Sequence, residues 1–361
     1  MDRSSRSTRA ATSAGNSLGA AACSGLTCTW VQGSSLAPMK IGMTVPQQDT
    51  LEATLAGFEQ GEGLGVHSLW FSQPVGGFDA LMVLALAAGR TDAARLGTAV
   101  IPTFPSHPLV TARAVQTAAA AAPGRIVLGV GAGHRRWIEH EYGQRFDRPV
   151  RQVTDWIGTV RRLLDGEALT ATDNAFGLTV AATDITVATP IVLAATGPKM
   201  LAAGGRVADG VLTWMCDETY LAEVVVPEVE SGAAAAGGDA PPVIAGVLIC
   251  VSDDPDRART ELRPRLAPLG EYESYQAVLS HGTLPSRTPV DVAAIGTEGE
   301  ITEILGRLTA VGASELVAVV LPDPANPAGS IGRARRLLGN LASEPQSPVA
   351  AEGSFLKHNG A

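Results

Sequence analysis

Apolar residues along the chain gather in short runs, and each run is followed by a stretch with the spacing of an amphipathic helix. The runs are apolar enough to be strands that are buried on both faces of a parallel sheet. They span residues 40–45, 67–72, 95–102, 125–131, 191–195, 209–214, 243–251 and 314–321. Eight strand–helix units in one chain are typical of a closed (β/α)8 barrel, an α/β fold of the TIM-barrel type, rather than of a doubly wound sheet.

The first helical stretch shows how these elements are predicted. Leu51, Leu55 and Phe58 share one face of a helix, which we expect to pack on the barrel. Asp49 is followed three residues later by Glu52, a spacing that resembles a capping box at the start of this helix.

Two segments interrupt the repeat. Residues 167–189 are rich in threonine and alternate in polarity, which predicts an inserted hairpin after the fourth unit. Residues 262–313 predict an additional loop and helix before the last strand. We therefore expect residues 39–343 to form a single barrel domain, with residues 344–361 as a flexible tail.

Residues 1–38 differ in composition from the remainder of the chain. They are rich in Ser, Thr, Ala and Arg and show no helical or strand period, so we expect a disordered extension or a true start at Met39. Arg3, Arg6 and Arg9 precede a weakly apolar stretch, as in a lipoprotein signal. Polar residues break up that stretch, which argues against a signal.

Charge and composition exclude several classes of protein. The chain has 361 residues and a net charge of -9, whereas a nucleic-acid partner requires a basic surface. No run of about 18 residues is apolar throughout, so no membrane span is expected. The four cysteines form no C-x-x-C pair, which argues against a zinc site and favours a reducing, cytoplasmic location. No other metal site is expected, because Gln144 replaces the second histidine of an H-E-x-x-H pattern.

The sequence VLGVGAGHRRW at residues 127–137 ends the fourth predicted strand. Its alternating Gly129, Gly131 and Gly133 do not match G-x-G-x-x-G, because His134 stands where a further glycine would be needed. Main chain without side chains at the carboxyl end of a barrel strand lets a flat ligand lie against the backbone. The alternative is a tight turn in which the glycines serve packing alone.

The sequence LAATGPKM at residues 193–200 ends the fifth strand. Pro198 is expected at the first helical position, so the amides near Thr196 and Gly197 should be unpaired and attract a phosphate. Lys199 adds positive charge there, although a solvated lysine is the alternative. Arg135 and Arg136 follow the glycine turn and complete a local anion site.

Taken together and in this order, several segments carry a resemblance to a known family. The sequence from Met39 to about residue 340 resembles luciferase-like TIM-barrel oxidoreductases, in particular the actinobacterial branch that uses the deazaflavin F420. The segments are LGTAVIPTFPSHPLVTARA (96–114), RIVLGVGAGH (125–134), YGQRFDRPVR (142–151), PIVLAATGPKML (190–201) and ADGVLTWM (208–215).

This resemblance implies where the cofactor lies. It implies a non-proline cis peptide at Ala99–Val100 that backs the deazaflavin ring. It places the ring and ribityl chain beside the fourth strand and the phosphate beside the fifth. The implied contacts of the ring and ribityl chain are Gly131, Ala132, Gly133 and His134. The implied contacts of the phosphate are Ala195, Thr196, Gly197, Pro198 and Lys199.

The chain departs from the family at the end of the second strand. Many relatives carry an acidic residue and a histidine there, whereas this chain has Gln73 and Pro74. Gln73 can hydrogen-bond the edge of the ring but cannot shuttle protons, which argues against sugar-phosphate dehydrogenation. His134 is the candidate general acid, since an imidazole with a pKa near 6.5 suits that role. The alternative is that His134 is a structural group holding the loop.

Further candidates are a histidine and three aromatic residues. We interpret His107 as a ligand contact or helix cap. Trp70, Phe71 and Trp214 stand at strand ends, where they either line an apolar substrate pocket or pack within the barrel.

The sequence thus favours an F420-dependent oxidoreductase that moves a hydride between the deazaflavin C5 and a small activated alkene, imine or ketone. One alternative is an FMN-dependent monooxygenase of the same superfamily. A second is a barrel that binds flavin or deazaflavin without catalysis. A homodimer is suggested by the resemblance alone.

Overall fold

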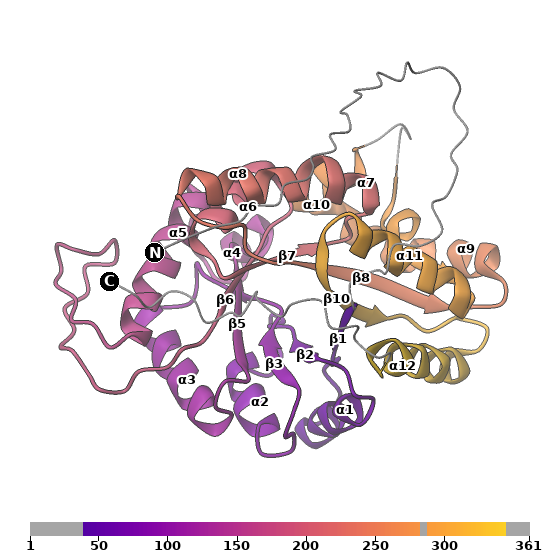
Figure 1. Cartoon of the computed structure of the whole chain (residues 1–361), viewed down its shortest axis with the longest axis horizontal. Coiled ribbons are helices and arrows are strands. Elements are labelled where there is room, and N and C mark those ends of the chain that lie inside the picture. The colour runs from indigo at the N-terminus through magenta and orange to yellow at the C-terminus, as the bar shows by residue number, and fades with distance from the viewer. Residues whose placement is uncertain (1–38, 282–286, 344–361) are drawn as a thin grey trace, which may run out of the picture. The chain divides into compact units, whose positions relative to one another are not determined.

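Parallel strands close into a barrel in the computed structural model, which describes residues 39–281 and 287–343 (Figure 1). The strands of the barrel are β1 (Lys40–Thr44), β2 (Ser68–Phe71), β3 (Arg95–Thr98), β5 (Ile126–Gly131), β6 (Ile191–Ala194), β7 (Gly210–Trp214), β8 (Val243–Val251) and β10 (Ala313–Val320). Closure follows from β10, which pairs with both β1 and β8. The predicted (β/α)8 barrel and all its strands are confirmed. The expectations for residues 1–38 and 344–361 lie outside the described residues.

The third predicted strand, residues 95–102, divides into two strands, and one further short strand was not predicted from the sequence. β4 (Ile101–Pro102) continues the line of β3 beyond a bend and pairs with β5. The bend contains the cis peptide Ala99–Val100, as the resemblance implied. β9 (Ala294–Gly296) lies in the insertion before the last strand and pairs with the end of β8.

Helices surround the barrel and cover its strands (Figure 1). They are α1 (Leu51–Gly63), α2 (Ala80–Ala87), α3 (Pro108–Ala121), α4 (Arg135–His140), α5 (Pro149–Leu164), α6 (Pro198–Val207), α7 (Glu218–Tyr220), α8 (Val226–Ala235), α9 (Pro255–Leu266), α10 (Glu273–Leu279), α11 (Glu298–Ala310) and α12 (Pro327–Ser343). The capping box predicted at Asp49 and Glu52 is wrong. Thr50 caps α1 instead, because its hydroxyl accepts from the Ala53 amide at 3.1 Å.

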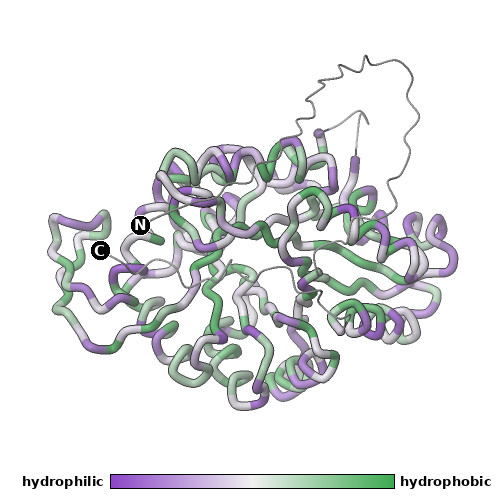
Figure 2. Tube along the Cα trace, viewed as in Figure 1, coloured by the Kyte–Doolittle hydropathy of each residue, from purple (hydrophilic) through white to green (hydrophobic). Residues whose placement is uncertain are grey.

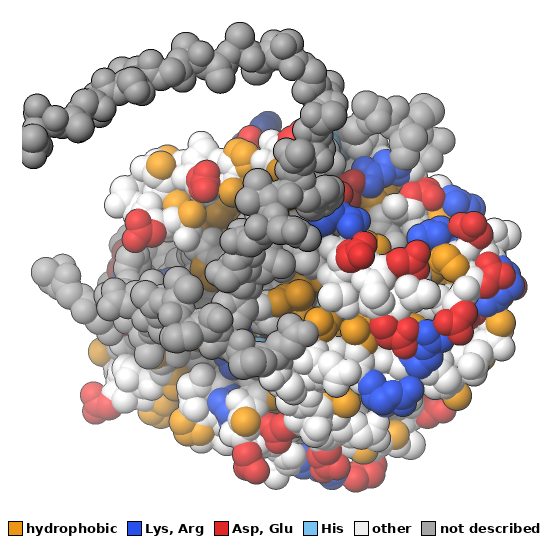
Figure 3. Space-filling view, turned by 45° about the vertical axis from the view of Figure 1, so that its right-hand side comes forward, with side chains coloured by type: hydrophobic (Ala, Val, Ile, Leu, Met, Phe, Trp, Pro, Cys, Tyr) orange, Lys and Arg blue, Asp and Glu red, His pale blue; other side chains and the backbone are white. Residues whose placement is uncertain are grey.

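Figure 2 shows hydrophobic residues along the central strands and hydrophilic residues on the surrounding helices and loops, as burial of a parallel sheet requires. Charged side chains of both signs are interspersed on the face shown in Figure 3. Among the described residues, no helix is both long and apolar enough to cross a membrane.

Trp70 fills the interior of the barrel. It is 1% exposed and belongs to a cluster with Val127, Val192, Leu212, Ile244 and Val317. A side chain at Gly97 would come within 2.4 Å of the indole, so glycine makes room for it. The indole N–H donates to Ser68 Oγ at 2.7 Å, and Ser68 in turn bonds the buried carboxylate of Glu315. The interpretation of Trp70 as a pocket wall is therefore wrong.

Phe71 is also buried, and it packs against Phe58 of α1 with ring centroids 6.2 Å apart. Phe71 thus stabilises the contact between the sheet and a helix and lines no open pocket. For both aromatic residues of β2, packing was the correct alternative.

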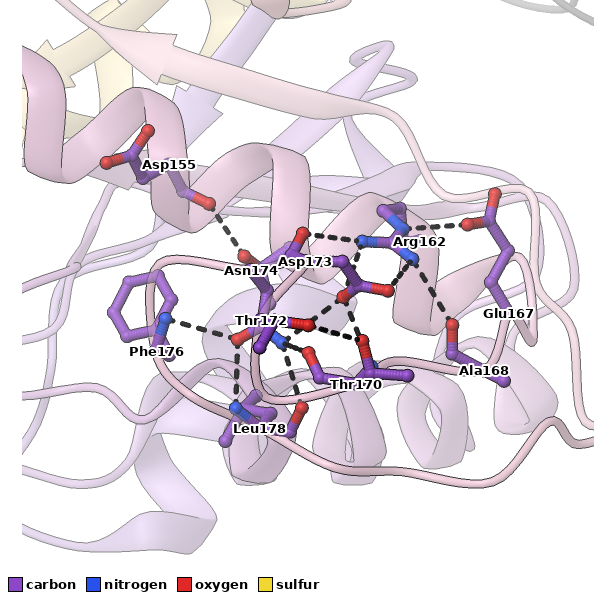
Figure 4. A network of polar contacts seen from close by, with 11 residues as sticks. Asp155, Arg162, Glu167, Ala168, Thr170, Thr172, Asp173, Asn174, Phe176 and Leu178 are labelled. Carbon is purple, nitrogen blue, oxygen red and sulfur yellow. Dashed lines mark hydrogen bonds and ion pairs between the residues drawn. The ribbon is translucent and has the colours of Figure 1, made fainter.

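The insertion at residues 167–189 forms the predicted hairpin only in minimal form. A single antiparallel bridge joins Leu169 and Val180, and the remainder of the insertion is loop. Polar side chains fix this loop on α5 (Figure 4). Asn174 accepts from the amides of Phe176 and Leu178, at 3.1 and 3.0 Å. Such side-chain bonds to the backbone compete with a strand ladder, which explains the outcome.

Candidate functional site

The three glycines of β5 and its turn have different structural roles. A methyl group at Gly129 would lie 1.8 Å from the Thr98 carbonyl oxygen, and Thr98 Oγ1 donates to the Gly129 carbonyl at 2.7 Å. Gly129 therefore permits the close packing of β5 on the cis bend. Gly133 has a φ of 77°, in the left-handed region that favours glycine. For these two residues, packing and turn geometry account for the glycine.

Gly131 lies among small apolar groups at the carboxyl ends of the strands. A methyl group there would come 3.1 Å from Val100 Cγ2 and 3.3 Å from Ala194 Cβ. Val100, Gly131 and Ala194 thus form an apolar shelf contributed by three neighbouring segments of the barrel. Val100 and Ala194 are half-buried, so the shelf is partly accessible from the mouth. Its lack of bulk suits a flat ligand.

The turn between β6 and α6 forms a second corner beside the shelf. Pro198 is the first residue of α6, as predicted, and the N-cap residue Gly197 provides no side-chain cap. A methyl group at Gly197 would meet no atom within 4 Å, so this corner is open. Lys199 is exposed at the second helical position. The Thr196 carbonyl accepts from the Tyr220 hydroxyl at 2.7 Å, which fixes the turn.

Residues 272–275, which we call the mouth segment, lie between these two corners. The Tyr272 ring stacks on His134 with centroids 4.0 Å apart. Ser274 Oγ lies 3.2 Å from His134 Nδ1, and the Tyr275 hydroxyl lies 3.3 Å from Nε2. Thr196 Oγ1 donates to the Ser274 carbonyl at 2.7 Å. The same short segment therefore contacts residues of both predicted cofactor-binding corners.

Burial determines the protonation state of His134. Desolvation disfavours the cation and lowers the pKa of His134 from 6.5 to about 4. The imidazole is therefore neutral near pH 7, with each ring nitrogen next to a hydroxyl of the mouth segment. In this arrangement His134 acts as a hydrogen-bonding group that holds a loop, which was the alternative to general acid.

The depressed pKa predicts a pH-dependent loss of stability. As the pH falls below 6.5, His134 becomes protonated in the unfolded chain. In the folded chain it stays neutral until the pH reaches about 4. The free energy of unfolding should therefore fall between pH 6.5 and 4, by roughly 2 kcal/mol after allowance for solvent screening. Urea unfolding of wild type and His134→Gln at both pH values checks this. An equal fall in the two proteins would contradict it.

The remaining predicted residues follow or end other strands of the barrel. Gln73 Oε1 accepts from the Ala80 amide at 2.8 Å, so its oxygen already helps to cap α2. His107 is exposed and occupies the N-cap position of α3, as one of its two interpretations predicted, although its imidazole makes no capping hydrogen bond. Trp214 is half-buried at the end of β7. It and Tyr275 both pack against the buried cluster that contains Met215.

Four residues of the site were missed by sequence reasoning: Tyr220, Tyr272, Ser274 and Tyr275. The last three lie about 140 residues from His134 along the chain. No local sequence pattern predicts a contact over such a separation. A weak signal was available, since two of the chain's four tyrosines fall within four residues. Among the described residues, no group of three or more His, Cys, Asp or Glu is arranged to hold a metal ion.

Fold and site together define a class of protein: a closed TIM barrel with a bare, apolar shelf at the carboxyl ends of its strands, next to a non-proline cis peptide. A family model described as luciferase-like monooxygenase matches residues 31–315. The chain belongs to this family.

Named relatives are similar to parts of the chain. A 5,10-methylenetetrahydromethanopterin reductase of Methanolobus tindarius is 29% identical over 205 residues, covering 55% of this chain and 61% of the reductase. An F420-dependent glucose-6-phosphate dehydrogenase of Kineococcus radiotolerans is 27% identical over 294 residues, covering 75% and 83%. The match to the first of these relatives thus spans about three fifths of its length.

Solved structures show the same fold. An F420-dependent secondary alcohol dehydrogenase in complex with an F420–acetone adduct superposes with a TM-score of 0.67 at 19% identity, covering 83% of this chain and 98% of that one. The coenzyme F420-dependent tetrahydromethanopterin reductase from Methanopyrus kandleri gives 0.67 at 20% identity, covering 84% and 98%.

Proposed function

We propose that the protein is an F420-dependent oxidoreductase that acts on a small activated alkene, imine or ketone. The observation that carries the proposal is the apolar shelf of Val100, Gly131 and Ala194, which presents main chain and small side chains and adjoins an open helix start. The named F420-dependent relatives support the choice of cofactor. When bound, F420 supplies or accepts a hydride at C5.

The residues at the barrel mouth fit F420 in two respects. The shelf offers main chain without bulky side chains, and the corner at Thr196, Gly197 and Lys199 offers helix amides and a positive charge for a phosphate. Trp70 fills the barrel below and excludes water from beneath the shelf. Gln73 keeps its amide N–H groups for a hydrogen bond to a polar ring edge, because only its oxygen is engaged by the residues that the structure describes.

For F420 to bind in this way, the mouth segment has to give up its contacts with His134 and Thr196. It now bonds His134 and Thr196, the side chains that would face the ligand. When it withdraws, His134 is rehydrated and its pKa returns towards 6.5, because burial is what lowers the pKa. His134 would then be able to deliver a proton to the substrate as a general acid.

Turnover tests this function against its alternatives. Reduced F420 should be oxidised in the presence of some member of a panel of activated alkenes, imines and ketones, and His134→Ala should slow that reaction about 100-fold. Tight F420 binding without turnover on any panel member would favour the non-catalytic barrel. Oxygen-dependent turnover with reduced FMN alone would favour the monooxygenase, since a carbon at ring position five does not support the oxygen adduct that flavins form.

We also propose a homodimer and a cytoplasmic location. The free thiols of Cys216 and Cys250 suit a reducing compartment. Every residue of α2 is apolar, and Met82 and Leu86 on its outer face are about half exposed. Val110 on the neighbouring α3 is 66% exposed. A helix that is apolar all round is normally covered on both sides, and an uncharged patch can pack against its own copy without repulsion.

This patch gives a direct prediction. Met82→Glu/Leu86→Glu should shift the protein from dimer to monomer in analytical ultracentrifugation, because two carboxylates would be buried on each side of the interface. Ile185→Glu, at an exposed residue of the 167–189 loop, is the matched control and should leave the dimer intact. A monomeric wild type would contradict the proposal.

A further inference from the structure

An open hollow of about 490 Å³ lies at the start of α5 and reaches α6. Its lining residues are Arg148, Pro149, Val150, Arg151, Thr154 and Arg206. Half of these residues are arginines and none is acidic. In a chain with a net charge of -9, such a local excess of positive charge indicates an anionic ligand.

The partners of the arginines support this reading. Arg151 pairs with Asp155 of its own helix at 3.3 Å, and the arginine remains largely exposed. Within the part of the chain that the structure describes, the side chains of Arg148 and Arg206 make no ion pair or hydrogen bond. Three guanidinium groups therefore share one carboxylate around the hollow, which leaves charge available for a ligand.

Arg162, further along α5, shows the opposite case. It borders a neighbouring hollow of about 280 Å³ and bonds Glu167, Asp173 and the Ala168 carbonyl (Figure 4). Its charge is neutralised by the 167–178 loop. The hollow at the start of α5 is thus distinguished by arginines without such partners, not by arginine content alone.

The hollow is placed within reach of the candidate site. α5 and α6 pack side by side and point the same way, since Arg161 near the end of α5 bonds Asp209 just beyond the end of α6 at 2.9 Å. Both helices therefore begin at the end of the barrel that carries the shelf (Figure 1). Lys199 and Arg206 lie on α6, and Arg148 and Arg151 lie at the start of α5, so the two helices carry positive charge from the corner at Lys199 to the hollow.

We propose that this hollow binds the oligoglutamate tail of F420, a flexible chain of carboxylates attached beyond the cofactor's phosphate. The inference rests on the proposed function. Arginine forms paired hydrogen bonds with a carboxylate, and carboxylates repeated along a chain suit arginines contributed by two helices. FMN ends at its phosphate. The arginines therefore also discriminate between the two cofactors.

Binding titrations of the double variant Arg148→Gln/Arg206→Gln test this site. The ligands are F420, the deazaflavin riboside without phosphate and tail, and FMN, each followed by fluorescence. The double variant should bind F420 at least tenfold more weakly than wild type, with unchanged affinity for the riboside and FMN. Added salt should weaken F420 binding more in wild type than in the variant. Arg265→Gln, at an exposed arginine of α9, is the matched control and should behave as wild type.

Each other outcome overturns the proposal. Equal F420 affinity in wild type and the double variant removes the tail site but leaves the proposed function standing. An equal loss for all three ligands in a double variant that unfolds at the wild-type temperature also removes the tail site, because the arginines would then act on no part that F420 alone carries. Failure of wild type to bind F420 overturns the proposed function and the tail site with it.

Discussion

Gly131→Ala is expected to weaken F420 binding about 100-fold, equivalent to about 2.7 kcal/mol, while leaving the barrel folded. The added methyl group would stand on the shelf, 3.1 Å from Val100 and 3.3 Å from Ala194. Both neighbours end in methyl groups that can shift by a few tenths of an ångström, whereas a flat ring lying on the shelf would be lifted off it. Fluorescence titration measures the affinity, and thermal unfolding reports the fold.

Gly129→Ala, two residues earlier, should lower the stability of the fold instead of acting on the affinity for F420 alone. Its methyl group would lie 1.8 Å from a backbone oxygen of the neighbouring segment, which cannot move aside cheaply. We expect a loss of stability of about 3 kcal/mol or more. Gly158→Ala on the exposed face of α5, where a methyl group meets nothing within 4 Å, is the control for both and should be neutral or slightly stabilising. A stable Gly129→Ala variant, or unimpaired binding by Gly131→Ala, would contradict the roles assigned here.

Loosening the mouth segment is expected to strengthen cofactor binding. Ser274→Ala/Tyr275→Phe removes both hydroxyls that contact the ring nitrogens of His134. If each hydrogen bond stabilises the closed arrangement by about 1 kcal/mol, the double variant should bind F420 about 30-fold more tightly, because less free energy is needed to open the site. The pKa of His134, followed by NMR, should rise from about 4 towards 6.5.

Ser280→Ala provides the control for this experiment. Its hydroxyl donates only within its own helix, to the Ala277 carbonyl at 3.3 Å, so neither affinity nor the pKa of His134 should change. Weaker F420 binding by the double variant would show that the mouth segment forms part of the cofactor's own binding wall. The requirement that the segment withdraw would then be wrong.

Local patterns predicted the barrel well. Runs of apolar residues fixed all the strands of the closed sheet, since a strand buried on both faces leaves a continuous signal. Pro198 marked the start of α6 for a similarly local reason, because proline lacks the amide that a first helical residue does not use. β9 escaped prediction because a segment of three residues carries no periodicity, and the apolar run 95–102 contains no sign of its division into β3 and β4.

Features that depend on distant contacts were predicted less well. The glycines of β5 were read as a single feature, yet the role of Gly129 depends on a bend some 30 residues earlier. The burial of Trp70 was not predicted, because the space left by Gly97 and the buried carboxylate of Glu315 that Ser68 contacts come from other strands. The neutral state of His134 depends on burial that also involves α10, and the sequence around the histidine contains no sign of it.

The central claim is that main chain at two corners of the barrel mouth holds a deazaflavin. Titration of purified wild-type protein with F420 and FMN, each added separately and followed by fluorescence, tests it most directly. We expect saturable, tight binding of F420 and much weaker binding of FMN. Tight binding of FMN without detectable binding of F420 would contradict it.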